Sequence, residues 1–523
     1  MGAPFLVLAI LTALSGASAP TQIRPPDPKS ALSPSGPLAD SEILELLAQP
    51  HAAHVFDAFE GQNASKRAQA SKSNGLFVAD GFPVDFSSSE LFESPFATNG
   101  ANAFVASITS LDAFALRLRV DLSLLGPSDE VFVIDPALPR AFGPYTNADH
   151  VDGGKWLATT PGDTCVLLVR TPEIEPPLFS LVSVSHFYED LDRQLKELSC
   201  NNDIACETDN ALEESATGVG MMIVPQGDFF QALCSGALIN NADTAAFEPY
   251  FLTSWHCVPD IVDANQVEIL WDWRDETCNG NDSPSISSLP RSDGERLLRT
   301  SSTYDITLME LDTVPSGDFG RAYLGWETRD PIDEEDVVTI HFPVGSPMKI
   351  SYGNVKEIDQ NSNGFTRQTK VHWEDGVTEG GSSGGPLLLA EDDYRICGTL
   401  SNGPAHSCLS TGGNVDWYSS FRDFFPSIED YLTGDTPPVV TPDPPVTCAA
   451  EKAFPGNTTV LDALRAFRDN GLKQSSLGES VVKLYYDTAP ATARAVEQSS
   501  LLRWTVRAVA VPVALASRML WDE

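Results

Sequence analysis

The sequence predicts a mainly β protein that contains more than one domain. A chain of 523 residues is too long for a single hydrophobic core. Short apolar runs separated by turns fill residues 75–190, and residues 304–311 alternate apolar and polar side chains as a half-buried strand does. Stretches rich in proline occur at residues 20–40 and 436–445. We therefore expect β domains joined by extended linkers.

The N-terminus has the pattern of an export signal. Residues 5–11 form a short apolar core, and Ala17-Ser18-Ala19 gives the small-residue pattern of a signal peptide cleavage site. A membrane anchor would need about 20 apolar residues, which is more than this run provides. No Lys or Arg precedes the core, and Pro20 follows the expected cut. We expect a protein that is secreted, periplasmic or on the cell surface.

The region from 75 to 190 predicts an antiparallel β-sandwich. Its clearest strand-like runs are Ala115–Leu122, Glu130–Ile134 and Cys165–Val169, with a turn at Pro161-Gly162-Asp163 before the last. A short helix is expected upstream at Ser41–Leu47. No residue of this region has a chemical signature. An inhibitory or folding-assisting pro-domain and a substrate-binding module both remain open.

Three segments further along the chain predict nucleophilic catalysis. Glycines surround Ser383 in residues 380–386, so the backbone there can turn sharply and direct two N–H groups at one point. His256 ends an apolar, strand-like run, and Asp305 stands at the start of the alternating strand. Taken singly these residues fit an ordinary turn, a core histidine and a strand-end cap. Their order along the chain is one of the known orders of a Ser-His-Asp triad.

With these segments in place, residues 197–433 resemble the chymotrypsin-fold, trypsin-like serine endopeptidases, and most closely the bacterial lysyl endopeptidases. The matching blocks are Leu252–Cys257, Tyr304–Leu308, His341–Pro343, Gly376–Glu379 and Gly398–Pro404. The resemblance implies two six-stranded antiparallel β-barrels with the active site in the crevice between them. It also implies that the Ser383 hydroxyl attacks the scissile carbonyl, that His256 transfers the proton to the leaving amine, and that Asp305 orients the imidazole. The backbone N–H groups of Gly381 and Ser383 would form the oxyanion hole.

Departures from the family pattern bear on activation and specificity. Ser382 stands where pancreatic enzymes carry an aspartate that pairs with a newly cut N-terminus, and Val377 stands where the trypsin branch carries its specificity aspartate. Asp416 matches the carboxylate by which lysyl endopeptidases bind the substrate lysine. A carboxylate in an apolar pocket would select a lysine or arginine head group, whereas a solvated loop acid is the other interpretation in so acidic a chain. Ser401 replaces a histidine of the best-known members, and we expect lysine to be favoured over arginine.

The nine cysteines fit an oxidising compartment. A zinc site is the competing interpretation, but no Cys-x-x-Cys spacing occurs, and we expect neither a metal nor a cofactor. The family resemblance implies the disulfides Cys200–Cys408, Cys206–Cys278 and Cys234–Cys257. It leaves Cys165, Cys397 and Cys448 unassigned.

The net charge of −40 disfavours nucleic acid and anionic membranes as partners. Cationic peptides would be attracted, so we expect peptide or protein substrates with basic residues and a monomeric enzyme. Beyond residue 448 the spacing is helical, and Cys448-Ala449-Ala450 keeps only the cysteine of the Cys-Phe-Ile box of exported bacterial proteins. The apolar residues 508–517 are too few for a membrane span and predict a core or interfacial helix. An interfacial helix would leave membrane association of the tail open.

Six parts are therefore expected. They are a signal peptide (1–19), a Pro/Ser-rich pro-segment or linker (20–74), the β-sandwich (75–190), the protease domain (197–433), a Pro-rich linker (434–447) and a small helical C-terminal module (448–523). The predicted function is a secreted serine endopeptidase that cuts after basic residues; the alternative is a catalytically silent binding protein of the same fold. Self-release of the N-terminal region would cut between Lys196 and Glu197, with Arg193 as a second possible site.

Overall fold

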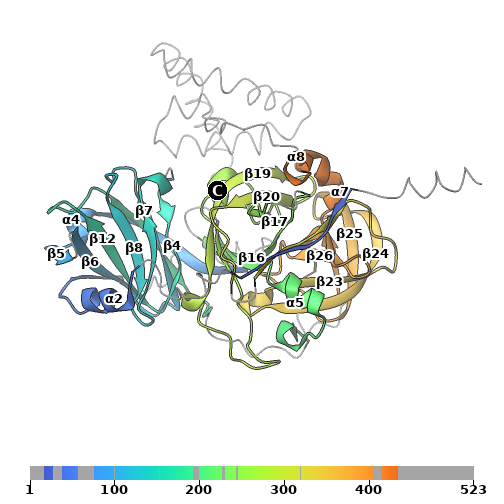
Figure 1. Ribbon diagram of the computed structural model, residues 1–523, viewed down its shortest axis with the longest axis horizontal. Helices are drawn as coiled ribbons and strands as arrows, with labels where there is room; N and C mark the ends of the chain where they lie inside the picture. Colours follow the sequence, from blue (N-terminus) through green and yellow to red (C-terminus); the bar gives the residue numbers. More distant parts are fainter. Residues whose placement is uncertain are drawn as a thin grey trace, which may run out of the picture. The chain divides into compact units, whose positions relative to one another are not determined.

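The computed structural model describes residues 17–26, 38–56, 76–98, 101–151, 153–191, 200–226, 230–242, 246–317, 320–404 and 414–433 (Figure 1). These described residues belong to one compact unit. The expected helical C-terminal module, with Cys448, lies outside the described residues and stays a prediction, as does the signal peptide core. Within the described ranges, no helix is long and apolar enough to cross a membrane.

The predicted β-sandwich is present. One of its sheets contains β10 (Lys155–Trp156), β7 (Ala115–Asp121), β13 (Ser180–Phe187) and β4 (Leu76–Ser87), with β11 (Thr160–Pro161) beside β7. The other contains β3 (Ala52–Phe56), β6 (Ala101–Ser110), β12 (Thr164–Thr171), β8 (Glu130–Asp135) and β9 (Arg140–Tyr145), with β5 (Phe96–Thr98) beside β6. Side chains from both sheets form one core. The three strands expected from sequence correspond to β7, β8 and β12.

Residues upstream of 75 also belong to this sandwich. Strand β3 pairs in parallel with β6, whereas the other pairings of the two sheets are antiparallel among the residues described. The expected short helix is α2 (Asp40–Leu47), which buries Ile43 and Leu46 against the outer face of the β6–β12–β8 sheet. The N-terminal β domain therefore begins upstream of residue 75, the predicted start of the sandwich.

The region expected to be the protease domain forms two closed barrels, which confirms the fold that the resemblance implied. In the first ring the order is β16 (Phe230–Leu238), β15 (Val219–Gln226), β18 (Glu268–Leu270), β19 (Arg291–Ser301), β20 (Ile306–Leu311) and β17 (Tyr250–Thr253), which pairs back with β16. In the second the order is β23 (Asp336–His341), β24 (Lys349–Ser362), β25 (Phe365–Asp375), β28 (Val415–Tyr418), β27 (Arg395–Asn402) and β26 (Pro386–Leu389), which pairs back with β23. Each barrel has its own interior core, and a third cluster with residues from both barrels lies between them.

Short elements complete the described chain. They are α4 (Ser88–Leu91), η1 (Asn147–Asp149), β14 (Asn202–Asp203), η2 (Ile204–Cys206), α5 (Asn210–Ala216), α6 (Ile261–Ala264), η3 (Ile286–Ser288), η4 (Pro343–Gly345), α7 (Phe421–Phe424), η5 (Phe425–Ser427) and α8 (Glu429–Leu432). Two N-terminal strands lie on the protease region: β1 (Ser18–Ala19) pairs with β22 (Trp326–Glu327), and β2 (Gln22–Arg24) pairs with β21 (Arg321–Tyr323). The expected signal peptide cut would fall between β1 and β2.

One strand joins the sandwich to the first barrel. Strand β4 pairs with β16, in a register that runs from Leu76 opposite Leu233 to Asp80 opposite Phe230. The sandwich sheet and the first barrel are therefore one continuous hydrogen-bonded sheet. This pairing brings the start of β4 close to Ser235 of β16, whose backbone N–H and hydroxyl contact the loop that carries Ser383.

Two of the disulfides implied by the resemblance are present, Cys206–Cys278 and Cys234–Cys257. Cys200 is also disulfide-bonded, but Cys408 lies outside the described residues, so that pairing stays a prediction. Cys165 and Cys397 are buried free thiols. Burial raises the pKa of Cys165 to about 12, so it is an unreactive core residue.

Candidate active site

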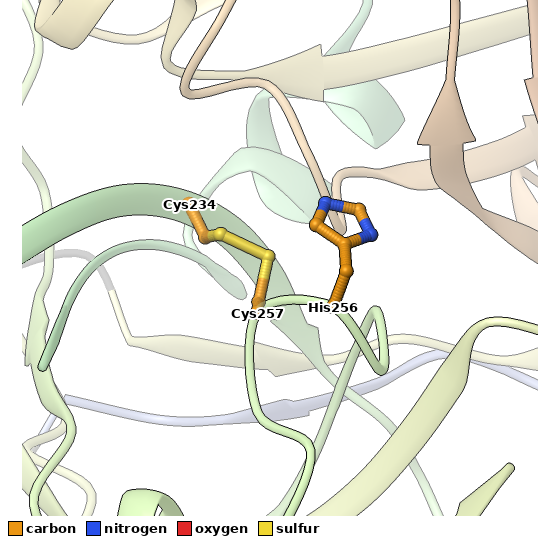
Figure 2. A group of neighbouring side chains, drawn as sticks. All are labelled: Cys234, His256 and Cys257. Carbon is orange, nitrogen blue, oxygen red and sulfur yellow. A yellow bond between two sulfur atoms is a disulfide. The ribbon is translucent and has the colours of Figure 1, made fainter. Parts of the chain in front are cut away.

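The turn after β17 carries His256, and a disulfide holds this turn in place. Cys257, the next residue, is bonded to Cys234 on β16, and Figure 2 shows the bridge beside the imidazole. The two half-cystines belong to strand and turn segments 23 residues apart in sequence. Because the bridge fixes the backbone directly after His256, the ring has a defined place at the edge of the first barrel.

Asp305 lies beneath the imidazole and is fully buried. It precedes β20 in a left-handed backbone conformation (φ 61°), a region that Asp tolerates better than most residues. Its Oδ2 lies 2.9 Å from His256 Nδ1, and its Oδ1 accepts from the His256 backbone N–H at 2.9 Å. Ser401 Oγ donates to Oδ2 at 2.5 Å. The carboxylate therefore holds Nδ1 as the protonated nitrogen and leaves Nε2 unprotonated.

The electrostatics of His256 suit a general base. Burial by itself lowers its pKa, but the charge and hydrogen bond of Asp305 outweigh burial and raise the pKa above the ordinary histidine value. The side chain is 12% exposed, and Nε2 has no hydrogen-bond partner among the residues that the structure describes. A reacting hydroxyl can therefore donate to this nitrogen without displacing another group.

The loop that carries Ser383 packs against the same turn. Ser235 on β16 donates from its backbone N–H to Ser383 O at 2.7 Å and from its hydroxyl to Gly381 O at 2.9 Å. Gly384 has φ +82°, and a Cβ there would lie 2.2 Å from Thr253 Oγ1. Only glycine fits at this contact, so the motif's glycine places the serine next to the end of β17.

The two proposed oxyanion donors lie in this loop. Gly381 has φ +96°, and a Cβ there would lie 2.7 Å from Phe342 O. In the described part of the chain, neither the Gly381 N–H nor the Ser383 N–H donates to a backbone or side-chain acceptor. Both amides are therefore available to a substrate oxyanion.

Asp416 lies in the second barrel and is 1% exposed, so it is not a solvated loop acid. It stands on β28, opposite Val371 of β25. Its Oδ2 accepts from Trp373 Nε1 at 2.6 Å and from Thr378 Oγ1 at 2.5 Å. A Cβ on Gly403 would lie 1.9 Å from Asp416 Oδ1, so the carboxylate reaches the backbone of the segment that follows β27. These contacts fix the carboxylate with neutral donors.

A metal is not the explanation for the sulfur and nitrogen atoms gathered at this site. Ligand atoms of Cys234, His256 and Cys257 lie within 4.8 Å of one another (Figure 2). The two sulfurs are bonded to each other, so neither is a thiolate that could bind zinc. The arrangement is a disulfide beside a base.

Sequence reasoning missed several residues that complete the site. Trp373 and Thr378 orient Asp416, and Ser401 was noted only as a departure from the family although it donates to Asp305. His341 lies in the matching block His341–Pro343, which implied no role for it, yet it contacts Ser382. Thr378 lies in the matching block Gly376–Glu379, which could have pointed to it. Trp373 lies in none of the matching blocks.

Comparison with known proteins agrees with the geometry. Residues 196–419 match the family model of the lysyl endopeptidase C-terminal domain. A lysyl endopeptidase of Pseudomonas aeruginosa is 28% identical over 369 residues, which cover 67% of this chain and 78% of that protein. The similarity predicted from sequence is confirmed, and these relatives support a serine protease hydrolase.

Solved structures are more distant. The HtrA-type protease AlgW with tripeptide is 15% identical with a TM-score of 0.31, covering 43% of this chain and 62% of that chain. The active form of the Rv3671c protease of M. tuberculosis is 13% identical with a TM-score of 0.31, covering 47% of this chain and 94% of that chain. This chain thus spans less than two thirds of the AlgW chain. Similarity at this level carries no functional argument.

Proposed function

We propose that this protein is a secreted serine endopeptidase that hydrolyses peptide bonds after basic residues, lysine before arginine. The nucleophile is Ser383, the base is His256, and Asp305 orients the base. The observation that carries the proposal is the buried Asp305 carboxylate bonded to His256 Nδ1 beside the glycine-rich Ser383 loop. Export is supported by the two disulfides.

The chemistry follows from these positions. Ser383 Oγ attacks the scissile carbonyl as His256 Nε2 takes its proton, and the developing oxyanion is held by the N–H groups of Gly381 and Ser383. The imidazolium, stabilised by Asp305, then protonates the leaving amine. Water hydrolyses the acyl-enzyme by the same steps in reverse, with His256 again as base.

The preference for basic residues is assigned to Asp416. It is a buried carboxylate of the second barrel, held in place by Trp373 and Thr378, and a buried carboxylate can pair with a cation that the substrate brings. The relative identified in Pseudomonas aeruginosa is a lysyl endopeptidase, which supports lysine as the favoured residue.

Cleavage of a mixed peptide library by the purified protein, with products identified by mass spectrometry, tests the proposal. We expect cuts after lysine, fewer after arginine, and almost none elsewhere. Cuts spread over apolar residues would refute the assignment of Asp416, while an absence of hydrolysis would refute the enzyme assignment.

We further infer that the N-terminal β domain is an inhibitory pro-domain. Strand β4 adds to β16, and Leu76 at its start lies against the oxyanion loop: a Cβ on Gly380 would be 3.3 Å from Leu76 Cβ, and one on Gly381 would be 3.4 Å from Leu76 Cδ2. Asp416 lies in the second barrel, whereas β4 approaches from the first. An extended segment in that position would occupy the space of the leaving-group side of a substrate.

The contact between the β domain and the first barrel has an apolar part, in which Val78, Ala79 and Phe187 share a core with barrel residues, and a buried polar part. Buried Arg117 of the β domain donates to Gln231 Oε1 at 3.0 Å and to Gln266 O at 2.8 Å. Thr159 donates to Glu268, which also pairs with Arg291 of the barrel. Arg291 remains paired with Glu268 when the β domain is removed. The removal would therefore not leave an unpaired carboxylate in the barrel.

Maturation tests this part of the proposal. The expected cut between Lys196 and Glu197, and the alternative after Arg193, lie outside the described residues. N-terminal sequencing should find Glu197 as the first residue of the active wild type and an uncut chain in Ser383→Ala. A fully active wild type that keeps its β domain would instead make that domain a permanent binding module.

The inhibitory contact can be tested separately. A chain that carries Lys196→Gln and Arg193→Gln should stay uncut and react slowly with a fluorophosphonate. Adding Leu76→Asp should speed labelling, whereas the control Asp85→Ala, at an exposed position of the same strand, should not. Equal labelling of all these chains would show that β4 does not obstruct the site.

A further inference from the structure

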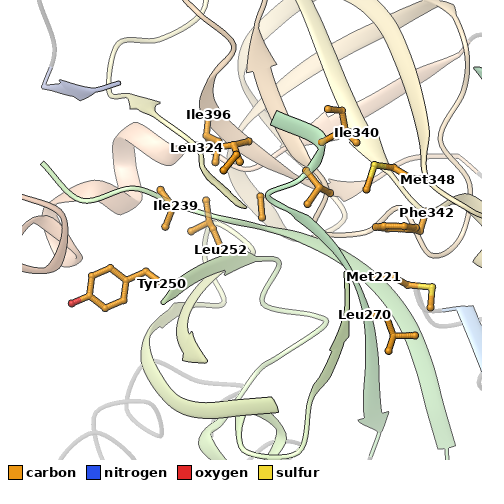
Figure 3. Packing of buried hydrophobic residues seen from close by; sticks show 14 of the residues in the cluster. Met221, Ile239, Tyr250, Leu252, Leu270, Leu324, Ile340, Phe342, Met348 and Ile396 are labelled. Atoms are coloured by element: carbon orange, nitrogen blue, oxygen red, sulfur yellow. The ribbon is translucent and has the colours of Figure 1, made fainter. Parts of the chain in front are cut away.

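His341 is a buried histidine that the proposed catalytic steps do not use. It ends β23, is 0% exposed, and stands between Ile340 and Phe342, which pack in the core between the barrels (Figure 3). Its Nδ1 lies 2.7 Å from Ser382 Oγ, and its Nε2 lies 3.2 Å from Ser351 Oγ. Ser382 directly precedes the proposed nucleophile.

The hydrogen bonds around this ring fit one neutral tautomer. Ser351 Oγ donates its proton to Val377 O at 3.1 Å, so it accepts from a protonated Nε2. Ser382 Oγ accepts from the Glu379 backbone N–H at 3.1 Å and gives its own proton to Nδ1. Each donor in this series of hydrogen bonds then has an acceptor.

The His341 ring is neutral around pH 7. Burial, and then the charge of Lys349, lower the pKa of His341 to about 3. The ring therefore does not exchange protons with a substrate at neutral pH. Its contribution is geometric.

Ser351 lies on β24, and the other groups bonded to His341 or to its two serine partners lie in residues 377–382, the segment proposed to shape the oxyanion hole. The chain of bonds ends on Val377 O, Glu379 N and Ser382 Oγ, and the Ser382 backbone N–H also donates to Glu379 O at 3.0 Å. Just beyond His341, the Val344 N–H donates to Gly380 O at 2.7 Å. The end of β23 thus holds the loop at several points.

We propose that His341 is a positioning residue that, through Ser382, holds residues 379–383 in the shape that binds the oxyanion. This inference rests on the proposed function of Ser383. Ser382 occupies the place of the aspartate that pairs with a new N-terminus in pancreatic enzymes, and a neutral serine cannot form that ion pair. The His341–Ser382 bond is built into the barrel, so the loop is ordered before any cut and activation consists of removing the β domain.

The first test does not depend on catalysis. In the Ser383→Ala background, His341→Phe keeps the ring shape and removes both polar contacts. Amide hydrogen exchange in residues 377–385 should become at least tenfold faster, whereas Val338→Ala, a core change on the same strand, should leave that segment unchanged. Unchanged exchange in His341→Phe overturns the inference even if the protein proves to be an active protease.

The second test measures catalysis and covers the case in which His341→Phe folds poorly. Ser382→Ala removes one hydroxyl and should lower kcat with little change in KM, in the same direction as His341→Phe, for which a loss of about 10²-fold is expected from a displaced loop. In the Ser382→Ala background, His341→Phe should cost less than a further threefold. Losses that multiply independently would overturn the inference while leaving the proposed function intact.

Discussion

Two buried carboxylates lie in the candidate site, and their surroundings differ in one respect. Asp305 in the first barrel is bonded to a titratable ring, His256, and to the hydroxyl of Ser401. Asp416 in the second barrel is bonded to an indole N–H and a hydroxyl, both neutral. An acid bonded to a titratable ring can stabilise the charge that arises on that ring during the reaction, whereas an acid fixed by an indole and a hydroxyl is proposed to receive a cation that the substrate supplies.

The largest effect is expected at Ser383, the proposed nucleophile. Ser383→Ala should lower kcat by about 10⁶-fold and abolish fluorophosphonate labelling, because the attacking oxygen is lost. The thermal unfolding midpoint should stay near the wild-type value, since Ser383 Oγ makes no hydrogen bond to the residues that the structure describes. Full labelling of this variant would show that Ser383 is not the nucleophile.

The next effect tests Asp305. Asp305→Asn should lower kcat by about 10⁴-fold while KM changes little, because the imidazole loses its orientation and its stabilising charge. Turnover of lysine and apolar substrates should fall by the same factor. A loss confined to lysine substrates would mean that the two acids have been assigned the wrong roles.

A smaller and selective effect is expected at Asp416. Asp416→Asn should cost lysine and arginine substrates about 3–5 kcal/mol in kcat/KM and cost apolar substrates little. Asp393→Asn is the matched control, because the Asp393 side chain is 86% exposed and should affect neither class. If every substrate lost the same factor, Asp416 would be structural.

The smallest effect is a shift of the pH profile. The pKa of His256 is raised, and only its neutral form accepts the serine proton, so activity falls as pH drops through that pKa. The midpoint of the acid limb of kcat/KM should therefore lie above about 6.5, the ordinary histidine value. In Asp305→Asn the residual activity should show a lower midpoint, while Asp416→Asn should leave it in place. A rate independent of pH from 5 to 9 would contradict a histidine base.

Much of this arrangement could be predicted from local patterns. The glycines around Ser383, the strand-like runs that end at His256 and begin at Asp305, and the alternating strands of the β domain each reflect a backbone requirement written within a few residues. The pairing of Cys234 with Cys257 followed from the family resemblance. Asp416 could be named as a candidate, but its burial could not, because an acid among many acids carries no local sign of its surroundings.

The amino-acid sequence by itself determined the β class, the residues of the proposed triad and the serine protease family resemblance. The tertiary structure decided which side chains serve them: Ser401 on Asp305, Trp373 and Thr378 on Asp416, and His341 on Ser382. It also decided that β4 of the β domain extends the first barrel up to the oxyanion loop. The physical reason is that motifs record local backbone geometry, whereas each of these contacts joins residues at least 38 positions apart in the chain. Only the folding of the barrels and the β domain brings such residues together.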